Sequence, residues 1–135
     1  MNIGKILISI ASTISIVFGV WHFFVPKIWN WYSYIDKTAT ELILAVRAIN
    51  VFFSATLVLF GVMNILMVWL EHESKSALLI VIVSSLLLWL IRIIMQIMYP
   101  QGAMNPVIQF GMLFVFVLTF ILYSIGLFLI IRYFR

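Results

Sequence analysis

The sequence has no cysteine and very little charge. Its 135 residues include eight Lys or Arg and four Asp or Glu, and 66% of them are hydrophobic. Soluble domains are about half apolar and about a quarter charged, so a soluble chain of this composition would expose far too much apolar side chain. The absence of cysteine excludes disulfide exchange, thiolate metal sites and iron–sulfur clusters. Eight scattered cations are too few for a nucleic-acid surface. The composition therefore predicts an integral membrane protein.

Four long apolar stretches predict four transmembrane helices. A helix needs about 20 mostly apolar residues to cross a bilayer. The stretches run over residues 3–24, 41–70, 77–98 and 107–133. The connections between them are short, so neighbouring helices must run antiparallel. We expect an all-α polytopic membrane protein, a single domain over residues 1–135 folded as an up-down-up-down four-helix bundle.

Proline and polar segments mark the predicted ends of these helices. Pro26 is expected to stop the first helix, which we expect to be retained because no Ala-x-Ala cleavage site follows it. Residues 38–41 have the spacing of a capping box for the second. The other predicted boundaries are a capping Ser74 or Ser76 in the polar turn 71–76, the turn 99–102, and Asn105 as a cap before Pro106.

Cations at the ends of the stretches predict the orientation. Both chain termini and the connection after the second stretch share one side, and the connection after the first stretch lies on the other. The positive-inside rule favours both termini in the cytoplasm, in a bacterial-type inner membrane. Tryptophan and tyrosine cluster on the opposite, outer side, as in an interfacial belt. The cations are Lys5, Lys75, Arg132 and Arg135 on the first side and Lys27 and Lys37 on the second.

Each stretch has one face that is richer in small and polar residues. Residues spaced by three and four share a helix face, and lipid-facing surfaces are apolar, so these faces are expected to point inward and to pack. The faces comprise Ser12, Ser15, Gly19, His22 and then Pro26; Arg47, Asn50, Ser54, Gly61 and Asn64; Ser85, Trp89, Arg92 and Gln96; and Gln109, Met112, Thr119, Tyr123 and Gly126.

Two arginines lie at a similar depth in the outer half. Arg47 is about 9 Å inside the start of the second stretch, and Arg92 is about 10 Å inside the outer end of the third, counted to Tyr99. Charges inside a span are costly and are candidates for function, and no Asp or Glu lies within the spans at this depth. We predict that the two guanidinium groups meet inside the protein. The predicted ligand-binding residues are His22, Arg47, Asn50, Trp89, Arg92, Gln96 and Gln109.

Guanidinium groups beside amides suit an oxygen-rich ligand. A lipid head-group phosphate, a carboxylate or the carbonyls of a quinone would fit. Two alternatives remain open: each arginine can snorkel to the interface, or it can bond helix carbonyls and hold the bundle together. His22 alone fits a partner in such a network better than a ligand or base.

The sequence gives little support for a catalytic site or a metal site. One imidazole with two cations is a poor metal site, and His72 lies at the opposite end from His22, which argues against a bis-histidine haem. No carboxylate within the spans could serve a proton-coupled multidrug exporter. Ser15 lies two turns from His22, too far for a nucleophile and base. An enzyme is therefore not the favoured class, and redox chemistry on a quinone would need an external electron donor.

A short motif ends the first stretch: Gly19-x-x-His22-Phe23-Phe24-x-Pro26, followed by Arg47 early in the second. In these residues the first half of the chain resembles the DoxX-like family of small four-helix bacterial membrane proteins. Gly19, His22, Pro26 and Arg47 are the matching positions. The family includes members linked to quinone-coupled oxidation, so the resemblance implies association with a quinone or a lipid.

Two functional hypotheses follow. In the first, the bundle binds an amphipathic anionic or quinone- or lipid-like molecule in its outer half; the cofactor is then unknown, with a quinone or a bound lipid as the candidates. In the second, the protein is a structural or accessory subunit of a larger membrane complex and has no ligand. Its partner is then a membrane protein or a second copy, and membrane lipids surround it in either case. The segment 25–39 is expected to lie on the lipid interface or to cover the outer opening as a lid.

Overall fold

The computed structural model describes residues 2–70 and 74–133. Within them, four long helices and a short 3-10 helix occur and no strand. Each long helix is long and apolar enough to cross a membrane. The structure thus confirms an all-α, four-helix membrane protein. The elements are α1 (Asn2–Ile28), η1 (Trp31–Tyr34), α2 (Thr40–Trp69), α3 (Lys75–Met98) and α4 (Pro106–Tyr133).

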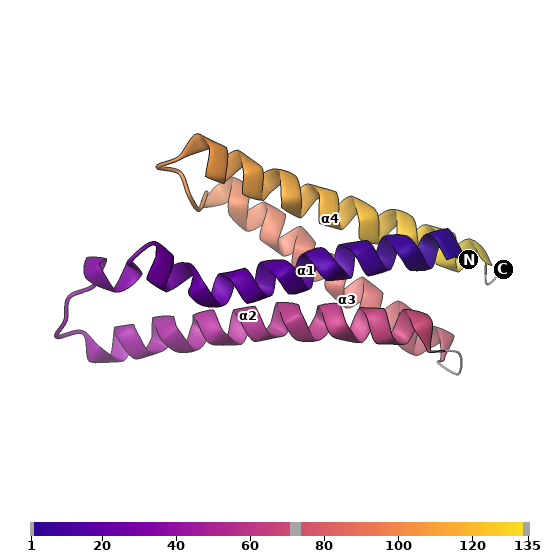
Figure 1. The fold of residues 1–135 in the computed structure, drawn as a ribbon, viewed down its shortest axis with the longest axis horizontal. Helices are drawn as coiled ribbons and strands as arrows, with labels where there is room; N and C mark the ends of the chain where they lie inside the picture. Colours follow the sequence, from indigo (N-terminus) through magenta and orange to yellow (C-terminus); the bar gives the residue numbers. More distant parts are fainter. Residues whose placement is uncertain (1, 71–73, 134–135) are drawn as a thin grey trace.

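The helices alternate in direction, so both chain termini lie at one end of the bundle (Figure 1). We call this the terminal end, and the opposite end, where α1 finishes, the Lys27 end. α1 packs along α2 and α4, and α3 packs mainly against α4. α3 crosses behind α1 and diverges from α2 toward the Lys27 end (Figure 1). As a result, α2 and α3 are less closely packed than the other neighbouring pairs.

α1 does not stop at its proline. Pro26 is buried within the helix, which continues to Ile28. Proline removes only the bond from its own nitrogen to the carbonyl four residues earlier, and the next turn survives because the Trp29 amide donates to the Val25 carbonyl at 3.0 Å. Asn30, with a left-handed φ of 50°, then turns the chain into η1. The predicted end at residue 24 was therefore wrong by four residues.

The predicted capping box at the start of α2 does not form. Ala39 is the N-cap residue and provides no side-chain bond. The amide and the hydroxyl of Thr38 instead both donate to Asp36 Oδ1 at 2.8 Å. The bond from the Thr38 amide, and then that from its hydroxyl, stabilise the carboxylate and hold the pKa of Asp36 below its ordinary value.

The boundaries of α3 and α4 agree better with the sequence. Ser74 is the N-cap residue of α3, although its side chain makes no cap bond, and the preceding residues 71–73, with His72, lie outside the described residues. The helix ends at Met98, before the predicted turn. Asn105 Oδ1 accepts a bond from the Val107 amide at 3.0 Å, and Pro106 opens α4. The predicted asparagine cap followed by proline is confirmed.

The interior is built from the small and polar faces of the four helices. In the terminal half, the Tyr123 hydroxyl donates to Ser12 Oγ at 3.0 Å, because the Ser12 proton is given to the Ile8 carbonyl. Asn64 Nδ2 donates to Ser85 Oγ at 2.6 Å. These bonds, together with that from Asn64 Nδ2 to Tyr123 Oη at 3.4 Å, link all four helices.

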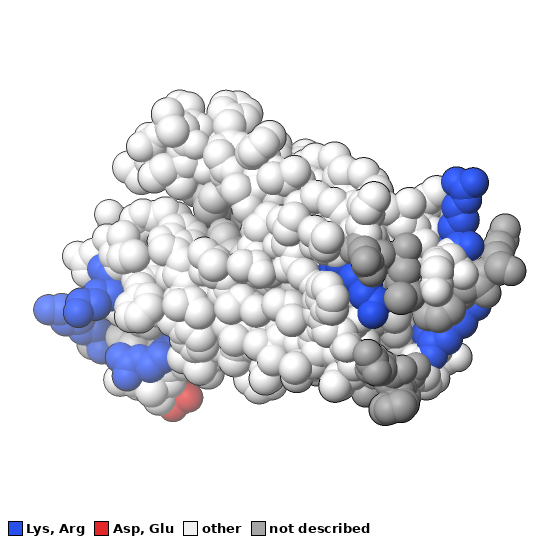
Figure 2. Space-filling model, turned by 45° about the vertical axis from the view of Figure 1, so that its right-hand side comes forward, with Lys and Arg blue, Asp and Glu red and all other residues white. Residues whose placement is uncertain are grey.

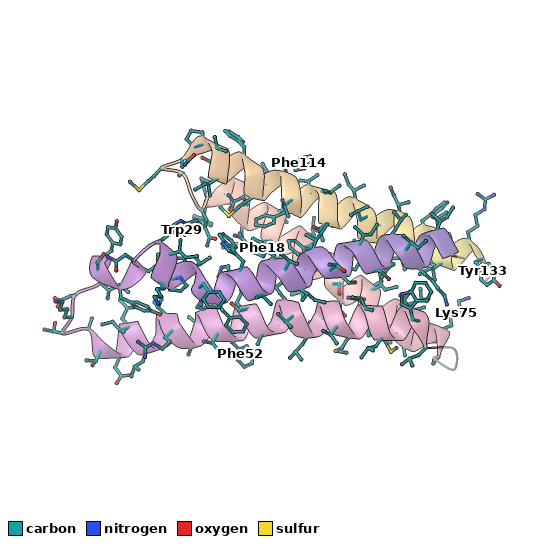
Figure 3. All side chains as sticks on the ribbon, in the orientation of Figure 1. Phe18, Trp29, Phe52, Lys75, Phe114 and Tyr133 are labelled. Carbon is teal, nitrogen blue, oxygen red and sulfur yellow. The ribbon has the colours of Figure 1, made fainter. Side chains whose placement is uncertain are left out.

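Large apolar side chains cover the outside. Phe52 on α2 is 79% exposed, and it points away from the bundle, as does Phe114 on α4 (Figure 3). On the face in Figure 2, Lys and Arg gather over the left end and the right half, with a broad uncharged area between them. This distribution is expected for a helical bundle surrounded by hydrocarbon.

Candidate functional site

A cavity of about 520 Å³ opens between α2 and α3, in the half of the bundle toward the Lys27 end. Its walls include Ile49 and Ile91, which are 68% and 57% exposed, so the cavity opens sideways toward the lipid. The divergence of α3 from α2 accounts for the space. The lining residues are Phe18, His22, Trp31, Val46, Ile49, Asn50, Phe53, Thr56, Leu57, Leu88, Trp89, Ile91, Arg92, Met95 and Gln101.

His22 lines the cavity from the last third of α1. Its ring packs edge-on against Phe53, with 4.7 Å between the centroids, and Nδ1 lies 3.4 Å from Ser54 Oγ. The Ser54 hydroxyl donates its single proton to the Asn50 carbonyl at 2.7 Å. Because Ser54 Oγ can then only accept, we assign the imidazole proton to Nδ1, and this assignment leaves Nε2 as an acceptor.

Asn50 is the buried polar residue of the α2 wall. Its side chain is only 5% exposed. Its Oδ1 atom is buried and has no hydrogen-bond partner in the described part of the chain. Buried polar atoms are nearly always bonded, so an open acceptor beside a cavity is a notable feature of this site.

Arg92 brings a positive charge to the α3 wall. Its Nη2 donates to Gln101 Oε1 at 2.7 Å, and its guanidinium lies 4.5 Å from the centroid of the Phe116 ring. The side chain is half-buried, and within residues 2–70 and 74–133 no carboxylate pairs with it. An amide oxygen and an aromatic face therefore hold the charge in place.

Trp89 separates the cavity from the polar interior of the terminal half. Its side chain is buried, and Nε1 donates to Ser15 Oγ at 3.0 Å. The ring packs against Phe18 and Phe116 at centroid distances of 6.0 and 5.5 Å. With its only donor already used, Trp89 offers the cavity an aromatic surface and no hydrogen bond.

Gln96 stabilises the connection between α3 and α4, and Gln109 takes part only through its backbone carbonyl. Gln96 Nε2 donates to the carbonyls of Gln101, at 2.9 Å, and Gln109, at 3.4 Å. Its Oε1 accepts from the Gln101 amide at 3.4 Å. Neither Gln96 nor Gln109 lines the cavity. These contacts bring Gln101 to Arg92, a role that the sequence did not reveal because it depends on how the loop folds back.

Arg47 lies outside the cavity. It is exposed, and its guanidinium is 5.6 Å from the centroid of the Tyr32 ring in η1. The neighbouring residue Val46 does line the cavity, and one residue further along a helix is a rotation of about 100°. The prediction that the two guanidinium groups meet inside the protein is therefore wrong. Of the predicted residues, the structure brings together His22, Asn50, Trp89 and Arg92.

No protein-family model, curated protein or solved structure matches this chain. The resemblance to DoxX-like proteins thus remains a prediction. Across residues 2–70 and 74–133, no three His, Cys, Asp or Glu side chains gather where they could hold a metal ion. The chemistry of the cavity follows from its aromatic walls, from the buried polar side chains of His22 and Asn50, and from the cation of Arg92.

Proposed function

We propose that the protein binds the head group of an amphipathic, lipid-like or quinone-like molecule in the cavity between α2 and α3. The observation that carries this proposal is Arg92, a half-buried cation that has no carboxylate partner in the described residues and lines an apolar cavity open to the side. A guanidinium group in such surroundings attracts phosphate, carboxylate or carbonyl oxygen.

The position of the cavity suits a ligand that arrives from the bilayer. Arg92 lies six residues before the last residue of α3, which is about 9 Å along the helix. A head group that binds Arg92 therefore lies inside the span, away from the end of α3. Its tail follows the exposed apolar walls at Ile49 and Ile91. The aromatic lining offers flat surfaces for a ring. The resemblance of the Gly19–Pro26 motif to DoxX-like proteins adds support for a quinone.

Native mass spectrometry of protein purified in lipid nanodiscs tests this proposal. Arg47→Gln is the matched control for Arg92→Gln, since each removes one cation but only Arg92 lines the cavity. We expect wild type and Arg47→Gln to retain a bound amphipath. In Arg92→Gln, the bound fraction should fall about tenfold or more, because a desolvated hydrogen bond to a charged group is lost. The proposal fails if wild type retains nothing, even with added phosphatidylglycerol, palmitate or a short-chain prenylated quinone. Equal loss in both variants also contradicts it.

A structural or accessory role is the second candidate. The polar network of the terminal half and the bonds of Gln96 to the α3–α4 connection explain those residues by packing alone. Under this alternative, substitutions of Arg92 lower thermal stability and complex assembly and leave no ligand to be lost. Cross-linking in native membranes, followed by co-purification, would reveal the membrane-protein partner or second copy.

A further inference from the structure

We infer that the ligand's head group carries a hydroxyl or similar hydrogen-bond donor facing Asn50, in addition to the oxygen that faces Arg92. This inference rests on the proposed function and specifies the chemistry of its ligand. It follows from an asymmetry in the hydrogen-bonding capacity of the cavity.

The side formed by α1 and α2 offers acceptors. Asn50 Oδ1 is buried and makes no hydrogen bond of ordinary geometry within residues 2–70 and 74–133, although the His22 ring is close enough to interact with the Asn50 side chain. The proton of Ser54 is given to the Asn50 carbonyl. The assignment of the His22 proton to Nδ1 leaves Nε2 as a second acceptor. Asn50 and Trp31 also carry N–H groups at the cavity, but Asn50 Oδ1 is satisfied only by a head group that brings its own proton.

The side formed by α3 offers a donor. The Arg92 guanidinium has five N–H groups, of which Nη2 contacts Gln101 Oε1. The indole N–H of Trp89 is already donated to Ser15. A head group that approaches this side must therefore bring an acceptor oxygen, and Arg92 is the group that binds it.

Asn64 provides an internal comparison. Its Oδ1 is also buried without a partner among the described residues, and it lies on the same helix, 14 residues or about 21 Å away. Asn64 is packed among Ser85 and Tyr123 and does not line the cavity. An open acceptor is unfavourable at both positions, but only at Asn50 can a ligand in the cavity satisfy it.

Ligands differ in whether they can satisfy both sides. A quinone carbonyl, a carboxylate or a phosphate diester without hydroxyls can bind Arg92 but leaves Asn50 Oδ1 open. A hydroquinone ring has a hydroxyl as well as oxygen acceptors, and so does a glycerol phosphate head group. The shared chemistry is a hydroxyl and an acceptor oxygen in one head group.

Two matched pairs of probes test the inference by competition, with bound ratios read by native mass spectrometry. The first pair is phosphatidylglycerol and phosphatidylmethanol, which share the phosphate but differ in hydroxyls. The second is a short-chain prenylated hydroquinone, kept under nitrogen, and its dimethyl ether. In at least one pair, we expect wild type to favour the hydroxyl member about tenfold, the value of one hydrogen bond to a buried acceptor. The pair that shows the preference identifies the source of the hydroxyl.

Asn50→Leu removes the acceptor oxygen and keeps a similar side-chain volume. We expect this variant to reduce the preference for the hydroxyl member of the pair to below about twofold. Asn64→Leu is the control and is expected to keep it. If Asn50→Leu retains the preference, or if wild type binds both members of both pairs equally, the inference is wrong while the proposed function stands. The wild-type comparison does not depend on the folding of any variant. If none of the four probes binds and wild type also retains no native amphipath, palmitate or prenylated quinone, the proposed function itself fails.

Discussion

Arg92 and Arg47 have the same side chain but different surroundings. Arg92 is half-buried beside Phe116, whereas Arg47 is exposed beside Tyr32. A buried charge loses hydration, and without a carboxylate partner this loss is only partly recovered. The proposed binding of a ligand would offset this cost, because an oxygen-rich head group restores part of the lost hydration.

This comparison predicts the effect of Arg92→Met on stability. Methionine preserves much of the volume and removes the desolvated charge, so we expect the free energy of unfolding to be unchanged or to rise by about 1 kcal/mol. Ligand retention should nevertheless be lost. Thermal unfolding in detergent, followed by tryptophan fluorescence, measures the stability, with Arg47→Met as the control. A loss of several kcal/mol would instead support the structural role of Arg92.

The lowered pKa of Asp36 predicts that its contacts with Thr38, which lie outside the spans, depend on pH. Its pKa is lowered in the folded protein, so the Thr38 contacts are strongest above the ordinary value of 3.8 and are lost as the pH falls through the lower, folded value. We expect the NMR shift of the Thr38 amide to titrate with a midpoint below 3.8. Asp36→Ala should abolish the titration. A midpoint at or above 3.8 would show that the bonds do not form in solution.

The packing of α1 on α2 depends on glycine. A Cβ on Gly61 would lie 2.6 Å from Ile16 Cγ1 and 2.8 Å from the Ser12 carbonyl oxygen. A Cβ on Gly19 would lie 2.9 Å from the Ser54 carbonyl oxygen. Backbone atoms cannot rotate away as a side chain can, so the two helices must separate if either glycine is enlarged.

We therefore expect Gly61→Ala to lower the free energy of unfolding by about 1–3 kcal/mol, the usual cost of overpacking. Gly111 on α4 is the control, because a Cβ there meets nothing within 4 Å. Gly111→Ala should leave stability unchanged or raise it slightly, since alanine favours helix. Equal effects at both positions would show that α1 and α2 are less close than the structure has them.

At the scale of the whole molecule, the cations support a proposed orientation. Lys5, Lys75 and Arg132 lie toward the terminal end, and Lys27 and Lys37 lie at the other. On the positive-inside rule, we propose that both termini lie in the cytoplasm. The natural sequence has no cysteine, so single cysteines can report the side directly.

For this test, Asp36→Cys and Ser74→Cys mark the two ends at exposed positions. In intact bacterial spheroplasts, we expect a membrane-impermeant maleimide to label Asp36→Cys at once and Ser74→Cys only after permeabilisation. The reverse pattern would invert the orientation, and labelling of both from outside would contradict the span assignment.

The sequence predicted the helices better than it predicted the site. Length, hydropathy and the Asn105–Pro106 cap located the spans within a few residues, because these signals are local. The continuation of α1 through Pro26 depends on bonds in the next turn, which the proline rule ignores. Arg47 and Arg92 were predicted to meet because they lie at a similar depth in the spans. Depth does not define the direction in which a side chain points around its helix. Gln101 reaches Arg92 through a loop whose path has no local signal.

The wide angle between α2 and α3 has a mechanical consequence. Asn50 and Arg92 stand on the two neighbouring helices that touch least, so the tilt of α3 determines how far apart they are. Helix tilt adjusts when the hydrocarbon layer becomes thicker or thinner. We therefore expect the distance between Asn50 and Arg92 to vary with the thickness of the bilayer. On the proposed function, the preference among head groups would then depend on the surrounding membrane.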